Sequence, residues 1–278
     1  MPSASRSPLL TSKEIEQLFI SRDTRSVSLE CSLDLQVSRS IIEIGPSEWA
    51  WNGRRFPYPE RFKERTVYYW ADAQGAFRPA ARFSSSLIKL VPTEWGAPTF
   101  EIDGIKMLPS AKISPFEDAR TKVALIQPGD KIILDTCGGL GYFGAWCVQA
   151  GAKHVQSYEL NSDVLWLRSI NPWSPDAAPP LTLIQEDVTR AIVTLATASV
   201  DAVLHDPPRF GIAGELYSLG FYSQLARVLK RRGRLFHYTG NPNKLTSRRD
   251  VPNEVAKRLR IAGFETEKIG DGILAVRK

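Results

Sequence analysis

Apolar and polar residues alternate with a period of two through much of the first third of the chain. The alternating or strand-like runs are 27–31, 33–37, 42–44, 49–51, 66–70, 86–91 and 100–107. A strand with one buried face shows this period because successive side chains point to opposite sides. Within the last run, Asp103-Gly104 favours a type I′ hairpin turn. We therefore predict a small β-rich domain over residues 1–111, preceded by a short helix over 11–20.

The pattern changes shortly after residue 111. Ser114, with Pro115 after it and Glu117 three residues on, has the form of a capping box and predicts a helix to about residue 126. Strands are then predicted over 131–135, 154–159, 181–186, 201–206 and 234–239, and helices over 140–150, 161–170, 214–230 and 252–262. This alternation predicts an α/β domain over 112–278 with a Rossmann-like, mostly parallel sheet. The runs 265–269 and 273–276 predict a final hairpin with one antiparallel strand.

Composition narrows the class of protein. With 43% hydrophobic and 24% charged residues, the chain has an ordinary globular composition. The first ten residues lack the apolar stretch of a signal peptide and no later segment has the length of a membrane span, so we expect a cytosolic protein without a membrane partner. Cys31, Cys137 and Cys147 form no CxxC pair and lie near no histidine at ligand spacing, so we expect no disulfide framework and no metal.

A glycine-rich turn follows the first predicted strand of the α/β domain. Asp135 ends that strand, and Thr136-Cys137-Gly138-Gly139-Leu140-Gly141 leads into a helix that starts near Tyr142. Such a turn presents backbone N–H groups and the positive end of a helix to a ligand. Two further acids, Glu159 and Asp187, follow the next two strands, with Leu160 and Val188 beside them. By themselves these acids are more typical of helix caps than of ligands, and only their place after successive strands, beside the glycine turn, favours binding.

At this point the chain resembles the class I methyltransferases that depend on S-adenosylmethionine (SAM). The resemblance implies that Asp135, Cys137, Gly138, Gly139, Gly141 and Tyr142 surround the cofactor. It implies that Glu159 binds the ribose hydroxyls and Asp187 the adenine amine, with Leu160 and Val188 alongside. The departure from the family pattern is Cys137, which stands where the family has its first glycine, a position that must accept the geometry of the turn.

The fourth strand ends in His205-Asp206-Pro207-Pro208-Arg209-Phe210. The two prolines stiffen the turn that carries Asp206, and this carboxylate is placed to hold an acceptor or take its proton. The motif is similar to the (Asp/Asn)-Pro-Pro-aromatic signature of methylases that act on base amines, with Arg209 in place of the aromatic residue and Phe210 one position later. Arg209 is interpreted either as an anion-binding residue or as a surface arginine. His205 is expected to pack inside the fold.

The run from Thr99 to Gly272 contains the segments ISPFEDARTKV, DTCGGLGY, HDPPRF with GELYS after it, and GRLFHYTGNP. With these segments it resembles a group of uncharacterised, largely archaeal methyltransferases without an established acceptor. We expect an acceptor pocket between Asp206–Phe210 and the N-terminal domain, with Tyr142, Tyr238 and Thr239 pointing towards it. The acceptor is RNA or a small molecule. The net charge of +6 is compatible with RNA. Basic-aromatic segments occur at 54–63 and 230–232, and for them we favour a solvated rim, with 230–232 completing a helix, over RNA binding.

Two other functions remain open. One is an aminopropyltransferase similar to spermidine synthases, which join a small N-terminal β domain to this cofactor fold and use decarboxylated SAM. Those enzymes need extra acids for a polyamine, whereas prolines and Arg209 follow Asp206 here. The other is a catalytically silent module that binds SAM or RNA. The oligomeric state is not predicted.

Overall fold

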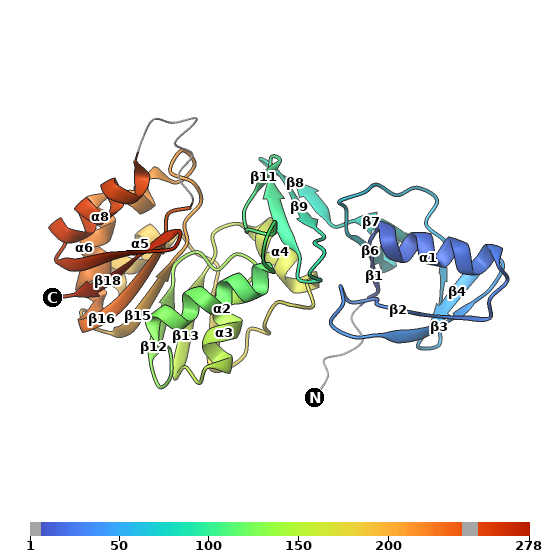
Figure 1. Cartoon of the computed structure of the whole chain (residues 1–278), viewed down its shortest axis with the longest axis horizontal. Coiled ribbons are helices and arrows are strands. Elements are labelled where there is room, and N and C mark those ends of the chain that lie inside the picture. Colours follow the sequence, from blue (N-terminus) through green and yellow to red (C-terminus); the bar gives the residue numbers. More distant parts are fainter. Residues whose placement is uncertain (1–6, 241–249) are drawn as a thin grey trace. The chain divides into compact units, whose positions relative to one another are not determined.

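The computed structural model describes residues 7–240 and 250–278. Two parts of the sequence analysis lie outside the described residues. One is residues 1–6, most of the N-terminal segment considered for a signal peptide, and the other is Asn241-Pro242, the end of a segment that resembles archaeal proteins. By their contacts the residues form two compact units, one of residues up to 118 with 166–174, and one of 119–165 with 175–278 (Figure 1). The division into domains 1–111 and 112–278 stays a prediction.

The described residues of the first unit form three small antiparallel sheets, the helix α1 and the second half of helix α4 (Ser162–Ile170). The strand orders are β1-β6-β7, β2-β3-β4-β5 and β11-β10-β9-β8. The elements are β1 (Leu9–Leu10), α1 (Ser12–Asp23), β2 (Ser28–Cys31), β3 (Ser40–Ile44), β4 (Glu48–Trp51), β5 (Arg54–Pro57), β6 (Tyr68–Ala71), β7 (Ala76–Pro79), β8 (Ala81–Phe83), β9 (Leu87–Val91), β10 (Thr99–Ile102) and β11 (Ile105–Lys106). A short 3-10 turn, η1 (Asp72–Gln74), joins β6 to β7.

The predicted elements of this unit are confirmed except at one place. Residues 33–37 form no strand, and Leu35 and Gln36 have positive φ values of 53° and 68° that an extended strand excludes. The period of two was misleading because a loop that buries alternate leucines produces it as well. At Asp103-Gly104 both residues have positive φ and Ile102 pairs with Ile105, as a type I′ hairpin requires.

Aromatic side chains form the centre of the first unit. Trp49 and Phe56, which face each other on β4 and β5, are almost completely buried and stack with ring centroids 4.7 Å apart. Trp166 and Trp173, far along the chain, also belong to this unit. Trp166 packs against Tyr69 with centroids 5.5 Å apart, and the Trp173 Nε1–H donates to the carbonyl of Leu35. These contacts explain why 166–174 groups with the N-terminal residues.

The second unit is built on a seven-stranded sheet with the order β14-β13-β12-β15-β16-β18-β17. Its strands are β12 (Ile132–Asp135), β13 (His154–Tyr158), β14 (Leu181–Ile184), β15 (Val200–His205), β16 (Leu229–Tyr238), β17 (Phe264–Ile269) and β18 (Gly272–Arg277). The strands pair in parallel except β18, which runs antiparallel to both β16 and β17. The predicted α/β class, with a mostly parallel sheet and one antiparallel strand near the C-terminus, is confirmed for this unit.

Helices cover both faces of the sheet. They are α2 (Pro115–Ile126), α3 (Tyr142–Gln149), α4 (Ser162–Ile170), α5 (Val188–Thr194), α6 (Leu219–Val228) and α8 (Val251–Ile261), with the 3-10 turn η2 (Gly214–Tyr217) before α6. The Arg120 guanidinium of α2 lies 5.7 Å from the Trp146 ring of α3, so these two share a face (Figure 1). On the other face α6 contacts both α5 and α8. No helix among the described residues is long and apolar enough to cross a membrane.

Two helix predictions need correction. Helix α5 was not predicted, because its sequence VTRAIVT is rich in β-branched residues and lacks a clear helical period. The helix predicted over 214–230 is a 3-10 turn followed by α6, since Ser218 caps a new helix and accepts a hydrogen bond from the Phe221 N–H. That helix ends at Val228, so residues 230–232 begin strand β16 and do not complete a helix.

The core of the sheet follows from its apolar strands. Leu134, Val203 and Leu235 occupy neighbouring positions on β12, β15 and β16, and none of the three has exposed surface. Buried on both sides, such strands are continuous apolar runs without alternation. Each buried leucine or valine contributes about 1.5–3 kcal/mol to stability. This core fixes the carboxyl ends of the strands, where the predicted site residues lie.

Candidate functional site at the carboxyl edge of the sheet

The strand order reverses between β12 and β15. From β12 the chain proceeds to β13 and β14 on one side, and β15 is followed by β16 on the other. Loops after β12 and β15 therefore diverge and leave a crevice at the carboxyl edge, the usual ligand position in open α/β sheets. The glycine loop follows β12 and the Asp206 loop follows β15. The predicted residues are thus attached to the two strands that border this switch point.

The glycine loop has the conformation that its residue types predict. Gly139 and Gly141 have φ values of 50° and 84°, which glycine accepts without a steric penalty. The N–H of Gly138 donates to the Tyr158 carbonyl at 2.7 Å and so joins the loop to β13. Cys137 is not among the described residues with positive φ. The turn therefore does not require a left-handed backbone at Cys137, and a residue with a side chain fits there.

Asp135 lies beneath the loop at the end of β12. It has no exposed surface, and its Oδ2 accepts a hydrogen bond of 2.8 Å from the Ser157 hydroxyl of β13. Asp135 and Ser157 are register partners in the sheet. Tyr142 opens α3 directly after the loop and is also buried, with 3% of its surface exposed. Asp135 thus lies directly before the glycine loop and Tyr142 directly after it, and both side chains are buried.

Glu159 is joined directly to the glycine loop. Its Oε2 accepts from the Gly139 N–H and its Oε1 from the Asn161 N–H, both at 2.9 Å. Each carboxylate oxygen has a second acceptor site, so the side chain can also accept hydrogen bonds from ligand hydroxyls. The next residue, Leu160, is 64% exposed. An exposed leucine beside an anchored carboxylate is an apolar surface suited to the flat face of a base.

Asp187 acts as a helix cap in the structure. Its Oδ1 accepts from the Thr189 N–H at 2.9 Å and from the Thr189 hydroxyl at 2.7 Å, at the start of α5. This is the alternative that the sequence left open, and the contact with adenine stays a prediction. Val188 is buried in the core cluster of the sheet. Its side chain is therefore part of the packing of α5.

The Asp206 loop places its three candidate residues differently. Asp206 is partly exposed at the end of β15, and Arg209 is exposed. The Phe210 ring packs edge-on against Tyr217 at 5.4 Å, and the Tyr217 hydroxyl donates to the Pro208 carbonyl. The η2 turn therefore holds the Asp-Pro-Pro loop from behind. Stacking of a base on Phe210 remains a prediction.

Electrostatics indicate that several of these groups lie close together. Burial raises the pKa of the Tyr217 hydroxyl, and the charge of Asp206, then Cys137 and Tyr238, raises it further. Loss of hydration inside the protein raises the pKa of the Cys137 thiol, and the nearby carboxylates of Glu159, Asp135 and Asp206 raise it further. The protein thus holds Cys137 as a neutral thiol.

Two buried histidines beneath the edge escaped the sequence analysis as a pair. His205 and His237 are register partners on β15 and β16, have no exposed surface and lie with ring centroids 4.4 Å apart. Since His205 Nε2 donates to the Leu216 carbonyl, its Nδ1 accepts from the Thr136 hydroxyl at 2.7 Å. His237 donates from Nδ1 to the Tyr238 carbonyl and accepts from the Tyr222 hydroxyl. Burial lowers the pKa of both imidazoles and keeps them neutral, so each ring donates one hydrogen bond and accepts another.

Lys122 is a second residue that the sequence analysis missed. It belongs to α2, is only 3% exposed, and its Nζ lies 3.8 Å from the centroid of the Tyr238 ring. Tyr238 ends β16, beside the Asp206 loop. The only sequence signal is its place in the ISPFEDARTKV segment, because nothing local distinguishes a buried lysine from an exposed one.

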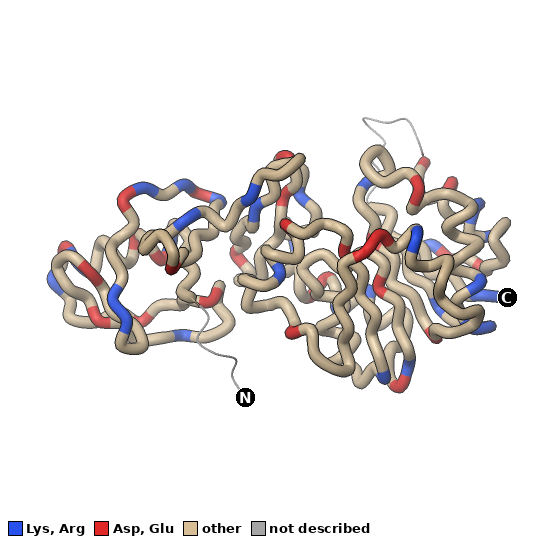
Figure 2. Tube along the Cα trace, turned by 180° about the vertical axis from the view of Figure 1, so that it is seen from behind, with Lys and Arg blue, Asp and Glu red and all other residues tan. Residues whose placement is uncertain are grey.

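Part of the charge in the basic segments is paired with acids. Phe56 is buried, and the nearby guanidinium of Arg54 contacts the carboxylate of Asp72. Lys230 pairs with Asp201 at 2.7 Å. Figure 2 shows Lys and Arg interspersed with Asp and Glu along the chain of both units. Binding of RNA by these segments stays a prediction.

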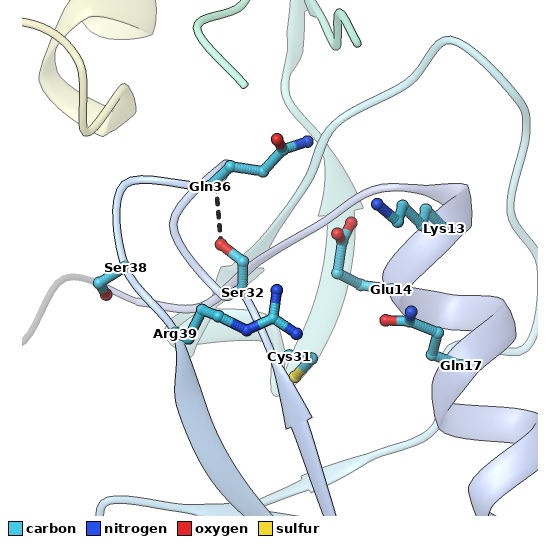
Figure 3. Close-up of a pocket in the computed structure, with 8 residues that line it drawn as sticks. All are labelled: Lys13, Glu14, Gln17, Cys31, Ser32, Gln36, Ser38 and Arg39. Carbon is cyan, nitrogen blue, oxygen red and sulfur yellow. Dashed lines mark hydrogen bonds between the residues drawn. The ribbon is translucent and has the colours of Figure 1, made fainter. Parts of the chain in front are cut away.

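The first unit contains a polar pocket of its own between α1 and the residues around β2 and β3 (Figure 3). Its lining residues are Lys13, Glu14, Gln17, Cys31, Ser32, Gln36, Ser38 and Arg39. Much of its polar lining bonds within the chain, as in the hydrogen bond of 2.7 Å from the Gln36 N–H to the Ser32 hydroxyl. None of the predicted site residues lines this pocket. Within the described residues, no group of histidine, cysteine and acidic side chains has the arrangement of a metal site.

Comparison with solved structures defines the class of fold. A spermidine synthase in complex with the transition-state analogue AdoDATO superposes with a TM-score of 0.58 at 14% identity, over 71% of this chain and 73% of that one. MNMC2 from Aquifex aeolicus gives 0.52 at 18% identity, over 71% and 72%. Structures described as SAM-dependent methyltransferases also match, at TM-scores of 0.41 to 0.45. The chain thus has the α/β fold that spermidine synthases share.

A homologous protein of similar sequence shows the family of this chain. No protein-family model matches the chain. The uncharacterised protein MJ1233 of Methanocaldococcus jannaschii is 40% identical over 220 residues, which are 77% of this chain and 74% of that protein. The chain belongs to the family of MJ1233. The resemblance to an archaeal group is confirmed at this level, whereas its Asp-Pro-Pro-Arg-Phe motif stays a prediction for that group.

Proposed function

We propose that the protein is a methyltransferase that binds SAM at the switch point of its second unit. The observation that carries this proposal is the hydrogen bond from the Gly139 N–H to Glu159, which unites the glycine loop with the strand-end carboxylate. In dinucleotide-binding folds a carboxylate so placed accepts the ribose hydroxyls. Asp135 and Tyr142 fix the loop. The exposed Leu160 offers an apolar face to adenine, and Asp187 borders the same edge.

The residues of the Asp206 loop supply the transfer site in this proposal. When bound, SAM supplies an electrophilic methyl group, whose bond to sulfur breaks as the acceptor's lone pair forms the new bond to carbon. Asp206 orients the acceptor and takes the proton that its nitrogen or oxygen loses. Pro207 and Pro208 keep that carboxylate in place, and such positioning contributes several kcal/mol to the rate. Arg209, which is exposed and follows three residues later in the same loop, binds an anionic group of the acceptor, either RNA or a small molecule.

The experiment tests cofactor binding and transfer separately. Calorimetry with SAM measures the first, and transfer from methyl-labelled SAM into an RNA pool or a small-metabolite extract measures the second. Asp206→Asn should lower transfer about 100-fold, within the range typical of a lost general base, while binding stays within a few-fold. Asp130→Asn is the control, because Asp130 is exposed and lies just before the amino end of β12, at the edge of the sheet opposite to the site. Absence of SAM binding by the folded protein would refute the proposal.

A second candidate is aminopropyl transfer from decarboxylated SAM. It is favoured by the superposition on spermidine synthase, which extends over 71% of the chain. Against it stands the exposed Arg209 in the same loop as Asp206, since a cation disfavours a polyamine acceptor. Formation of an aminopropylated amine from decarboxylated SAM and putrescine would establish this reaction in place of methyl transfer.

A further inference from the structure

The polar pocket of the first unit has a volume of about 330 Å³ (Figure 3). One of its walls is α1, which contributes Lys13, Glu14 and Gln17 from one side of the helix. The other wall is the connection from β2 to β3, which contributes Cys31 at the end of β2 and residues from the segment 32–39. With this volume, at the lower end of the range for small-molecule sites, the pocket accommodates a small metabolite.

The connection between β2 and β3 is fixed by hydrogen bonds within the chain. Leu35 and Gln36 both have positive φ values, 53° and 68°, which residues with side chains rarely adopt. The Ser32 hydroxyl accepts from the Gln36 N–H at 2.7 Å, and the Asp34 carboxylate accepts from the Ser38 N–H at 2.9 Å. Unfavourable backbone conformations persist only where the surrounding structure holds them. This wall of the pocket is therefore formed before a ligand binds, which lowers the entropic cost of binding.

Charged groups of both signs line the pocket. Lys13 and Arg39 are cations on its two walls, and Glu14 is a carboxylate with only 7% of its surface exposed. The Oε2 of Glu14 accepts from the Thr11 N–H at 3.0 Å, and each carboxylate oxygen can accept more than one hydrogen bond. The Arg39 Nε–H donates to Glu30 at 3.0 Å, and the two Nη groups of the guanidinium carry four further donors. The pocket thus offers two cationic donors and one anionic acceptor.

The thiol of Cys31 shows that these charges converge on the pocket. Cys31 is 2% exposed, and the pKa of its thiol is raised to about 11, mainly by burial and also by the Glu14 carboxylate, whereas the Arg39 guanidinium lowers it. Both charges therefore act on the same sulfur. Figure 3 shows the Arg39 guanidinium extending from the start of β3 towards α1. Because the thiol is protonated at neutral pH, it is not a thiolate nucleophile, and the pocket is suited to binding.

We propose that this pocket binds a free amino acid with an acidic side chain, such as glutamate. The two carboxylates of the ligand bind Lys13 and Arg39, and its ammonium binds Glu14. The side-chain amides of Gln17 and Gln36 supply further hydrogen bonds. A phosphate dianion fits less well, because the Glu14 carboxylate repels it and finds no cation on it. The pocket lies within the first unit, so this inference does not depend on the proposed methyltransferase site.

Calorimetry with three probes tests this complementarity of charge. L-Glutamate carries all three charged groups, L-glutamine lacks the side-chain carboxylate, and glutarate lacks the ammonium. The unmodified protein should bind L-glutamate with a dissociation constant below about 1 mM. It should bind each of the other two probes at least about 10-fold more weakly, because each loses one charge-assisted contact.

Two variants assign the contacts to residues. Arg39→Gln removes one cation and should weaken L-glutamate binding at least about 10-fold. Arg55→Gln is the matched control, because Arg55 is also an exposed arginine of the first unit, lies 4.0 Å from the carboxylate of Glu48 and does not line the pocket. Glu14→Gln keeps a residue type that the capping box of α1 accepts, and it should abolish the preference for L-glutamate over glutarate.

Hydrogen exchange locates the bound probe. L-Glutamate should protect the segments 12–17 and 31–39, the two walls of the pocket. Thermal midpoints establish that each variant is folded, and the probe series on the unmodified protein needs no variant. No heat of binding with L-glutamate, equal affinities for the three probes, an unchanged affinity in Arg39→Gln, or protection confined to the second unit would each overturn the assignment.

Discussion

Single residues at the carboxyl edge have structural as well as binding tasks. Asp135 is completely buried and is held by the Ser157 hydroxyl, while Glu159 bonds to backbone N–H groups on two sides. A buried carboxylate is stable only when hydrogen bonds replace its lost hydration. The residues predicted to hold a cofactor are therefore ordered by the protein before any ligand binds, which lowers the entropic cost of binding.

The Ser157 hydroxyl should contribute measurably to stability. Ser157→Ala removes a buried hydrogen bond to a carboxylate, and such bonds contribute about 1.5–3 kcal/mol. We expect the free energy of unfolding in urea to fall by about 2 kcal/mol. Ser169→Ala is the matched control, because Ser169 is exposed and bonds only to a nearby carbonyl in α4. Equal stabilities of the two variants would show that the Ser157–Asp135 bond is not important.

At the scale of elements, hydrogen bonds and a ring contact between neighbouring strand ends fix the position of the loops that border the crevice. Thr136 after β12, His205 on β15 and His237 on β16 form a row across three strands, and α6 supplies Tyr222 to the same row. Both imidazoles must be neutral for this pattern, since each accepts one hydrogen bond. The arrangement of the loops after β12, β15 and β16 is therefore linked to the protonation of two side chains.

The histidine row predicts a dependence of stability on pH. Burial lowers the pKa of His205 from 6.5 to about 4, and burial followed by the proximity of His205 lowers the pKa of His237 as well. Between pH 6.5 and about pH 4 the histidines of the unfolded chain are protonated while His205 in the folded protein is still neutral. Stability therefore falls as the pH drops from 6.5 towards 4. The loss from His205 alone is roughly 3 kcal/mol. Above pH 6.5 the two histidines cause no further change.

Urea unfolding at several pH values measures this slope. His205→Gln should flatten the decline between pH 6.5 and 4, whatever its effect on stability at neutral pH. His154→Gln is the control, because His154 is only partly buried at the start of β13, far from the row. A slope in His205→Gln that equals the slope of the unmodified protein would contradict the assigned protonation state.

At the scale of the whole molecule, the chain forms two compact units, and the candidate site residues Asp135, Glu159, Asp187 and Asp206 all belong to the second. A ligand that binds this unit when folded stabilises it by mass action. The first unit contains its own aromatic core and polar pocket. Its role in holding the acceptor stays a prediction.

Ligand binding should therefore protect the second unit selectively. S-adenosylhomocysteine, the product of methyl transfer, at 100 times its dissociation constant adds about 2.7 kcal/mol and should raise the thermal midpoint by roughly 5–10 °C. In hydrogen exchange, protection should centre on 136–142 and 158–161, the loop and the strand end around Glu159. Glu159→Gln at the same ligand concentration should show a smaller rise. Protection centred on the first unit would contradict the location of the site.

Local sequence determined most of the second unit's architecture and its glycine loop. The order of strands and helices was predictable from the period of apolar residues, and the turns at Gly139–Gly141 and at Asp206-Pro-Pro from their glycines and prolines. All of these signals determine the backbone conformation within a few residues. Only the tertiary structure decided that Lys122 lies on Tyr238, that His205 packs edge-on against His237, and that 33–37 is a loop. These outcomes depend on contacts between residues distant in the chain, for which no local pattern exists.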